Sequence, residues 1–216
     1  MNNKDLIDKL TDGGPKRPCQ SSHKVVAKWL VLMAVYFSAL MAISGFRSDI
    51  ALKILNPLYL IELSLMLLTT IAAVYGASFL ALPDSNQRPW IRFVPLVPLA
   101  LLLGIICYGL CCSETMPFIE CLKSGRYDCI AHVTLYSIVP IVAIFYTVQK
   151  AAPIKCCWAG AMAGLSAASF GYIVLRLVSD KSDDPTSLII WHFLPVVAVV
   201  MVSTILGKVI FSRIWK

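Results

Sequence analysis

Long apolar stretches dominate the chain, and short polar segments separate them. A helix needs roughly 20 mostly apolar residues to cross a bilayer core of about 30 Å, because each residue rises only about 1.5 Å. Six stretches meet this requirement. The pattern therefore predicts six membrane-spanning helices with cores at residues 29–45, 58–82, 93–112, 129–148, 158–178 and 188–207.

The connections between these stretches are too short to let neighbouring helices run parallel, so we expect an antiparallel bundle. The predicted fold class is an all-α polytopic membrane protein. Residues 1–28 form a polar N-terminal tail, and residues 29–216 form one transmembrane domain. Composition agrees, since 58% of the residues are hydrophobic and 14% are charged, whereas a soluble domain carries about 25% charged residues. The same balance excludes a disordered chain.

The net charge of +7 is explained by where the basic residues lie. Positive charge in short loops marks the cytoplasmic side of a membrane. With the N-terminus in the cytoplasm, the cytoplasmic segments hold thirteen Lys and Arg residues, and the opposite segments hold six, namely Arg47, Lys53, Lys123, Arg126, Arg176 and Lys181. We therefore expect both termini in the cytoplasm. Basic segments facing an anionic leaflet require no direct contact with nucleic acid.

The N-terminal tail contains a short amphipathic segment. Leu6, Ile7 and Leu10 fall on one side of a helix, and Asp5 and Asp8 accompany them. A helix of about eight residues is marginal in water. The segment is therefore either an ordinary solvated leader or a helix that docks into the groove of a partner, with the three aliphatic side chains as anchors.

Glu62, His132 and His192 are ionisable residues inside the predicted spans whose side chains suggest a chemical or structural role. A carboxylate in the bilayer is costly, by about 2.5 to 3.5 kcal/mol at a helix centre. Glu62 is either a structural acid, protonated or hydrogen-bonded, or a polar latch that couples helices through His132 or His192. His132 also follows Cys129 by three residues on one helical face, but two ligands do not complete a metal site. No metal or cofactor is expected.

Cysteine is frequent, with eight residues in the chain. The predicted topology puts four of them around one non-cytoplasmic loop, where disulfides are permitted: Cys111, Cys112, Cys121 and Cys129. A bridge from either member of the adjacent pair to Cys121 or Cys129 is the arrangement we expect. For Cys121 and Cys129, a sensing role and a loop staple both remain open.

The fifth stretch is rich in small residues and contains Gly160 and Gly164 four residues apart. Such a face lets helix backbones approach closely. We expect this packing to occur within the chain, with dimerisation as the alternative, and the sequence leaves the oligomeric state open.

Several segments together resemble the NrsF-like family, the negative regulators of sigma F. They are the leader DLIDKL, the close of the first span GFRSDI, the second span NPLYLIELSL with its exit FLALPDS, the CI entry and Pro140 of the fourth span, the fifth span AGAMAGLSAA, and Trp191. The resemblance covers nearly the whole chain.

This resemblance implies a six-helix bacterial inner-membrane anti-sigma factor without catalytic activity. Its partner would be an extracytoplasmic-function sigma factor, held by the cytoplasmic tail and released on stress. Cys129 matches one outer cysteine of the family. The family's second cysteine, after the fifth span, has no counterpart in LRLVSDKSDDP, so Cys111, Cys112 or Cys121 would have to take its place.

Two other functions are compatible with six spans. A membrane thiol oxidoreductase that passes electrons from outer thiols to a quinone would need an exchangeable cysteine pair, often as Cys-x-x-Cys, and no outer loop has this spacing. A small transporter would be expected to show repeated halves, and the chain shows none.

Overall fold

The computed structural model describes residues 22–81, 88–112, 117–150, 153, 155–179 and 184–212. These residues contain six helices that are long and apolar enough to cross a membrane, and they contain no strand. The predicted all-α, six-span fold is therefore confirmed. The first five spanning helices are α2 (Ser22–Ser44), α4 (Pro57–Leu80), α5 (Leu96–Cys112), α7 (Tyr127–Lys150) and α8 (Cys156–Val178).

The sixth span changes its helical type along its length. It begins as one turn, α9 (Pro185–Ser187), continues as the π-helix η3 (Leu188–Phe193) and ends as α10 (Leu194–Ser212). The carboxylate of Asp184 caps its start by accepting a hydrogen bond from the amide of Ser187 at 3.2 Å. The wide π turn places Trp191 and His192 inside the protein, where both are buried.

Short helices occupy segments that the sequence predicts only as connections. They are α3 (Ile50–Ile54), the 3₁₀ turn η2 (Pro89–Phe93) and α6 (Phe118–Lys123). Gly45, at φ 72°, turns the chain out of α2, as its missing side chain permits. Asn56 then caps α4 by accepting a hydrogen bond from the amide of Leu58 at 3.0 Å, with Pro57 in the first turn.

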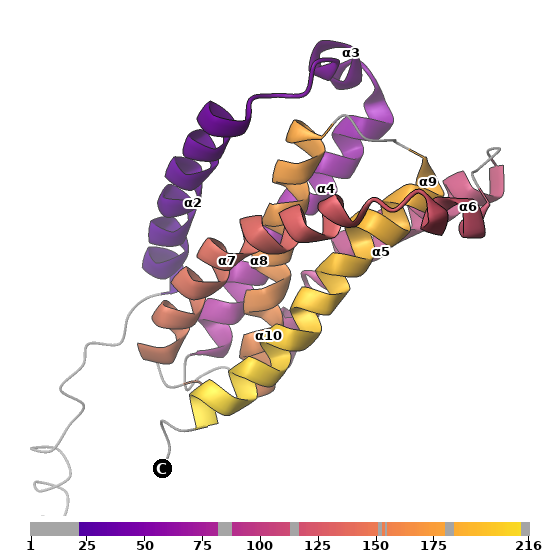
Figure 1. The fold of residues 1–216 in the computed structure, drawn as a ribbon. Helices are drawn as coiled ribbons and strands as arrows, with labels where there is room; N and C mark the ends of the chain where they lie inside the picture. Colours follow the sequence, from indigo (N-terminus) through magenta and orange to yellow (C-terminus); the bar gives the residue numbers. More distant parts are fainter. Residues whose placement is uncertain are drawn as a thin grey trace, which may run out of the picture.

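Successive spans run in opposite directions, so the bundle has two distinct ends (Figure 1). We call the end at which α2 begins and α10 finishes the tail end. The opposite end, where α3 joins α2 to α4, is called the α3 end. The starts of α4 and α7 and the last turns of α5 and α8 all lie at the α3 end.

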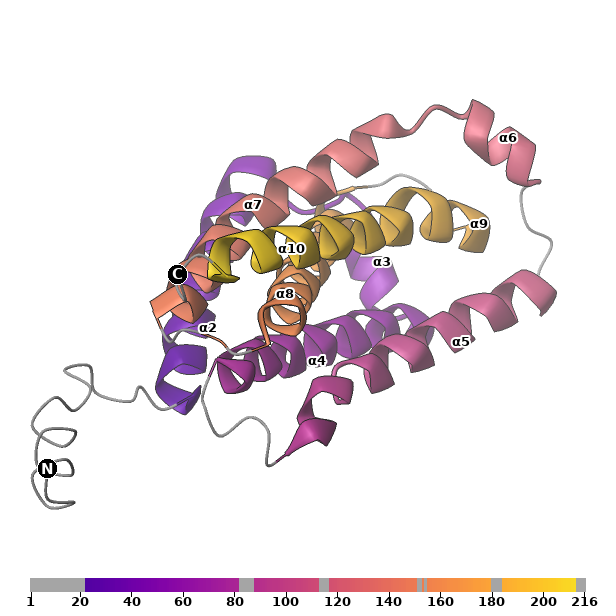
Figure 2. The same ribbon diagram turned by 90° about the horizontal axis from the view of Figure 1, so that it is seen from below.

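Helix α8 is the centre of the bundle. Figure 2 shows it enclosed by α4, α7 and α10, with α5 lying outside α4. Small residues permit this position. A Cβ atom on Gly160 would lie 2.5 Å from the carbonyl oxygen of Ser203 and 2.8 Å from Cα of Gly207, both on α10. The small-residue face is therefore used for packing within the chain.

Candidate functional site

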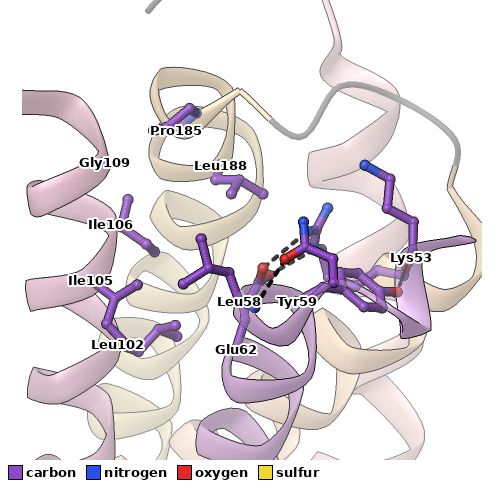
Figure 3. Close-up of a pocket in the computed structure, with 12 residues that line it drawn as sticks. Lys53, Leu58, Tyr59, Glu62, Leu102, Ile105, Ile106, Gly109, Pro185 and Leu188 are labelled. Atoms are coloured by element: carbon purple, nitrogen blue, oxygen red, sulfur yellow. Dashed lines mark hydrogen bonds and ion pairs between the residues drawn. The ribbon is translucent and has the colours of Figure 1, made fainter. Parts of the chain in front are cut away.

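A buried polar site joins α4 to α8 near the α3 end (Figure 3). The carboxylate of Glu62 accepts hydrogen bonds from Nε of Arg176 at 2.6 Å and from its Nη2 at 2.9 Å. The hydroxyl of Tyr172 donates to the same carboxylate at 2.5 Å. Tyr59 completes the group, which we call the polar cluster: Tyr59, Glu62, Tyr172 and Arg176.

Helical spacing puts the members of the polar cluster on facing surfaces. Tyr59 and Glu62 are three residues apart on α4, and Tyr172 and Arg176 are four apart on α8, so each pair shares one helical face. The Tyr59 hydroxyl donates to the main-chain oxygen of Arg176 at 2.9 Å, and its ring lies 5.1 Å from the guanidinium carbon. Each helix thus supplies both a charged group and a tyrosine to the same contact.

The charges in this site are almost fully buried. Arg176 is 3% exposed and Glu62 is 8% exposed. Two such charges are tolerated away from water only when they pair and their remaining hydrogen-bonding groups find partners. Within a membrane they hold the two helices at one relative position, because sliding either helix would separate the charges.

Glu62 is hydrogen-bonded and joins two helices, but its ion-pair partner is Arg176 and neither of the histidines suggested by the sequence. His132 is exposed on α7, where its Nδ1 lies 2.6 Å from the main-chain oxygen of Asp128. His192 is buried on η3, and its ring centroid is 6.1 Å from that of Tyr172, so it touches the polar cluster without replacing Arg176. Arg176, expected among the charges outside the membrane, lies inside α8.

A second charged pair closes the turn between α2 and α3. The Arg47 guanidinium binds the carboxylate of Asp49 through Nε and, at 2.9 Å, through Nη2. This hydrogen bonding lowers the pKa of Asp49 below its usual value of 3.8. The amide of Arg47 donates to the main-chain oxygen of Leu177 at 3.0 Å. The GFRSDI segment is thereby attached to the last turn of α8.

The cysteines are divided between the surface and the core. Cys121 on α6 and Cys129 on α7 are each 1% exposed and belong to the same apolar cluster as Tyr172 and Trp191. The Trp191 indole donates to the main-chain oxygen of Cys121 at 3.3 Å. Cys111 is exposed on α5. Within the described part of the chain, Cys111 and Cys121 form no disulfide bond, so the bridge expected from Cys111 is not formed; the side chain of Cys112 lies outside the described part.

The residues predicted to bind a partner through the N-terminal tail lie outside the described residues; they are Asp5, Leu6, Ile7, Asp8 and Leu10. Cys129 and His132 line a small cavity of about 140 Å³ together with Asp128 and Tyr136. Within the described ranges, however, no group of three or more His, Cys, Asp or Glu side chains is placed to hold a metal ion.

Comparison with known proteins gives one match. The family model described as "Negative regulator of sigma F" matches residues 10–212. No curated protein and no solved structure matches the chain. The matched range contains all six spans and the polar cluster, and it begins at the last residue of the predicted docking segment.

Proposed function

The chain belongs to the NrsF family, the negative regulators of sigma F, and from this premise we propose that it is an anti-sigma factor that holds an extracytoplasmic-function sigma factor at the bacterial inner membrane. The match over residues 10–212 is the observation that carries the proposal. The six membrane-spanning helices support it by providing an anchor. In this account the protein acts by binding and has no catalytic activity.

The sigma factor binds to the N-terminal tail in the mechanism we propose. Leu6, Ile7 and Leu10 enter an apolar groove of the partner, while Asp5 and Asp8 face its basic residues. Both chain termini lie in the cytoplasm, as the excess of Lys and Arg in those segments favours. A sigma factor held there is kept from the transcription machinery, and the anti-sigma factor needs no nucleic-acid contact of its own.

Release begins at the opposite end of the bundle. We propose that stress acts on Cys129 and its neighbours Cys121, Cys111 and Cys112, and that the change in packing alters the exposure of the tail. Cys121 and Cys129 belong to the apolar cluster that also contains Tyr172 of the polar cluster. A change at these thiols can therefore bias the α4–α8 contact, provided that the stimulus distinguishes two bundle states.

The thiol oxidoreductase alternative is disfavoured by burial. Exchange with a partner requires thiols that another molecule can reach. Cys121 and Cys129 are each 1% exposed and belong to a buried apolar cluster.

A co-purification experiment tests the role of the tail. The full chain, a variant lacking residues 1–20 and the triple variant Leu6→Ser, Ile7→Ser, Leu10→Ser are each expressed with the co-encoded sigma factor. We expect the full chain to capture the sigma factor and both variants to lose most of it, because the apolar anchors are gone.

The control is the double variant Asn2→Ser, Asn3→Ser, which alters the same tail without touching the aliphatic face and should capture normally. All variants are first shown to insert in the membrane in equal amounts. Equal capture by the full chain and the deletion variant would contradict the proposed docking segment.

A further inference from the structure

A cavity of about 200 Å³ lies beside the polar cluster, between α4, α5 and the start of the last span. Figure 3 shows Leu102, Ile105 and Ile106 of α5 across the cavity from Glu62, with Lys53 on the side away from α5. One wall is therefore apolar and the other carries charge. Leu102 and Ile106 are buried, whereas Leu58 at the mouth is well exposed.

The charged wall favours an anion. Two cations, Lys53 and Arg176, line the cavity with one carboxylate, Glu62. Asn56 adds an amide group: its oxygen is held by the amide of Leu58, so its NH₂ group is the part that can donate to a ligand. The N-terminus of the 24-residue helix α4 opens at the same place, and its dipole also favours negative charge.

The size and position of the cavity limit what the anion can be. About 200 Å³ is less than the roughly 300 to 1,000 Å³ of pockets that enclose a drug-sized ligand. The cavity thus takes a small charged group and leaves any longer portion outside. It lies where α4 begins and near the end of α5, at the boundary of two predicted spans, which is the depth at which lipid head groups sit.

We propose that this cavity binds the phosphate head group of an anionic phospholipid. The phosphate lies by Lys53, Asn56 and the start of α4, and the acyl chains leave the mouth past Leu58 and Ile105 along the apolar surface of α5. The ion pair of Glu62 and Arg176 stays intact and forms the floor of the site. Long basic side chains at the ends of spans reach toward head groups in this way.

Native mass spectrometry of the full chain in neutral detergent tests the proposal without any sigma factor. The probes are phosphatidylglycerol, phosphatidylcholine with the same acyl chains, and glycerol phosphate without chains. We expect the first phosphatidylglycerol molecule to bind more tightly than further phosphatidylglycerol molecules do, and more tightly than phosphatidylcholine. Lys53→Gln should weaken this first binding event about fivefold, as expected for one basic residue beside an anionic head group.

Two further variants separate the cavity from the general surface. Lys208→Gln removes an exposed lysine of α10 and should leave the first binding event unchanged. Ile105→Trp fills the mouth without altering charge and should weaken it. Equal affinity for the two phospholipids, equal loss in Lys53→Gln and Lys208→Gln, or binding of glycerol phosphate as tight as that of phosphatidylglycerol would each overturn the proposal, the last by assigning the site to a soluble phosphate.

Discussion

Arg176 lies in a helix of mostly small and apolar residues, and its charge is tolerated there because Glu62 accepts two of its hydrogen bonds. Neither residue is stable in that position alone. A buried charge whose partner is removed costs about 3 to 5 kcal/mol, while replacing both charges by apolar residues of similar volume is often neutral. The pair is therefore best understood as one unit that fixes how α4 and α8 meet.

A double-mutant cycle tests this interdependence. We expect Glu62→Leu and Arg176→Met each to lower the free energy of unfolding by about 3 to 5 kcal/mol, because each leaves one buried charge unpaired. The double variant Glu62→Leu, Arg176→Met should lose much less than the sum of the two single variants, because no unpaired charge remains. Unfolding of the purified protein in detergent measures all three. Additive losses would contradict the coupling.

Tyr172→Phe is the matched control for this cycle, since it removes one hydroxyl and leaves both charges. A hydrogen bond to a charged group contributes about 1.5 to 3 kcal/mol, so its loss should be smaller than that of either single charge variant. A loss as large as that of Arg176→Met would show that the tyrosine, and not the ion pair, fixes the contact.

The ion pair of Arg47 and Asp49 should make the thermal stability of the protein depend on pH. The bound Arg47 guanidinium lowers the pKa of Asp49 from its usual 3.8, so the carboxylate stabilises the folded state above that pH and the contribution is lost as the pH falls through the folded-state pKa. The wild type should therefore have a higher thermal midpoint than Asp49→Asn near neutral pH, and the two should converge well below pH 3.8. A gap that persists in strong acid would contradict this assignment.

The spanning helices could be predicted from the sequence, whereas the contacts between them could not. Apolar length is a property of one segment, so the spans follow from the sequence, although α2 begins at Ser22 rather than near Trp29. The partner of Glu62 is a property of two helices, and two residues that are 114 positions apart leave no local pattern. A sign was nevertheless present: Arg176 is an opposite charge close to the same end of a neighbouring span.

Other elements were missed for physical reasons. Helix α6 depends on burial of Cys121, and the π turn depends on burial of Trp191 and His192, so both need the folded core. In contrast, the spacing of the small residues of α8 indicates a close-packing face from the sequence alone. In the structure, Gly160 lies against α10 and Gly171 lies against the Ser137 side chain of α7.

Two glycines allow a controlled test of helix packing. Gly160→Ala would bring a methyl group to 2.5 Å from the main-chain oxygen of Ser203, and backbone cannot move aside easily. We expect a loss of about 1 to 3 kcal/mol in unfolding free energy. Gly104→Ala on α5 meets nothing within 4 Å and should be neutral or slightly stabilising. Equal effects of the two substitutions would contradict the close approach of α8 and α10.

Over the whole molecule, the proposed stimulus and the proposed partner act at opposite ends. Glu62 near the start of α4, Cys129 in the first turn of α7 and Arg176 in the last turn of α8 are all close to the α3 end, whereas α2 begins at the other end (Figure 1). A 23-residue helix such as α8 spans about 35 Å. Any coupling must cover this length, and α8, which packs against α4, α7 and α10, is the rigid element that reaches both ends.

This account requires the two ends to face different compartments. We expect a membrane-impermeant maleimide applied to intact cells to label a chain whose only cysteine is Ile119→Cys on α6, and to leave unlabelled a chain whose only cysteine is the native Cys157. Both original side chains are exposed in the structure, so accessibility to the reagent depends on the side of the membrane. Opening the cells should label both. The reversed pattern would contradict the orientation and the cytoplasmic docking of the tail.

The end of α8 shows why the segment between α2 and α4 is more than a connection. The last carbonyl groups of a helix have no partners within it, and lipid offers none. Here Arg47 and Tyr59 supply donors to Leu177 and Arg176. Two oxygens at the end of the central helix are thus satisfied from within the protein, and lengthening residues 45–59 would move both donors away from them.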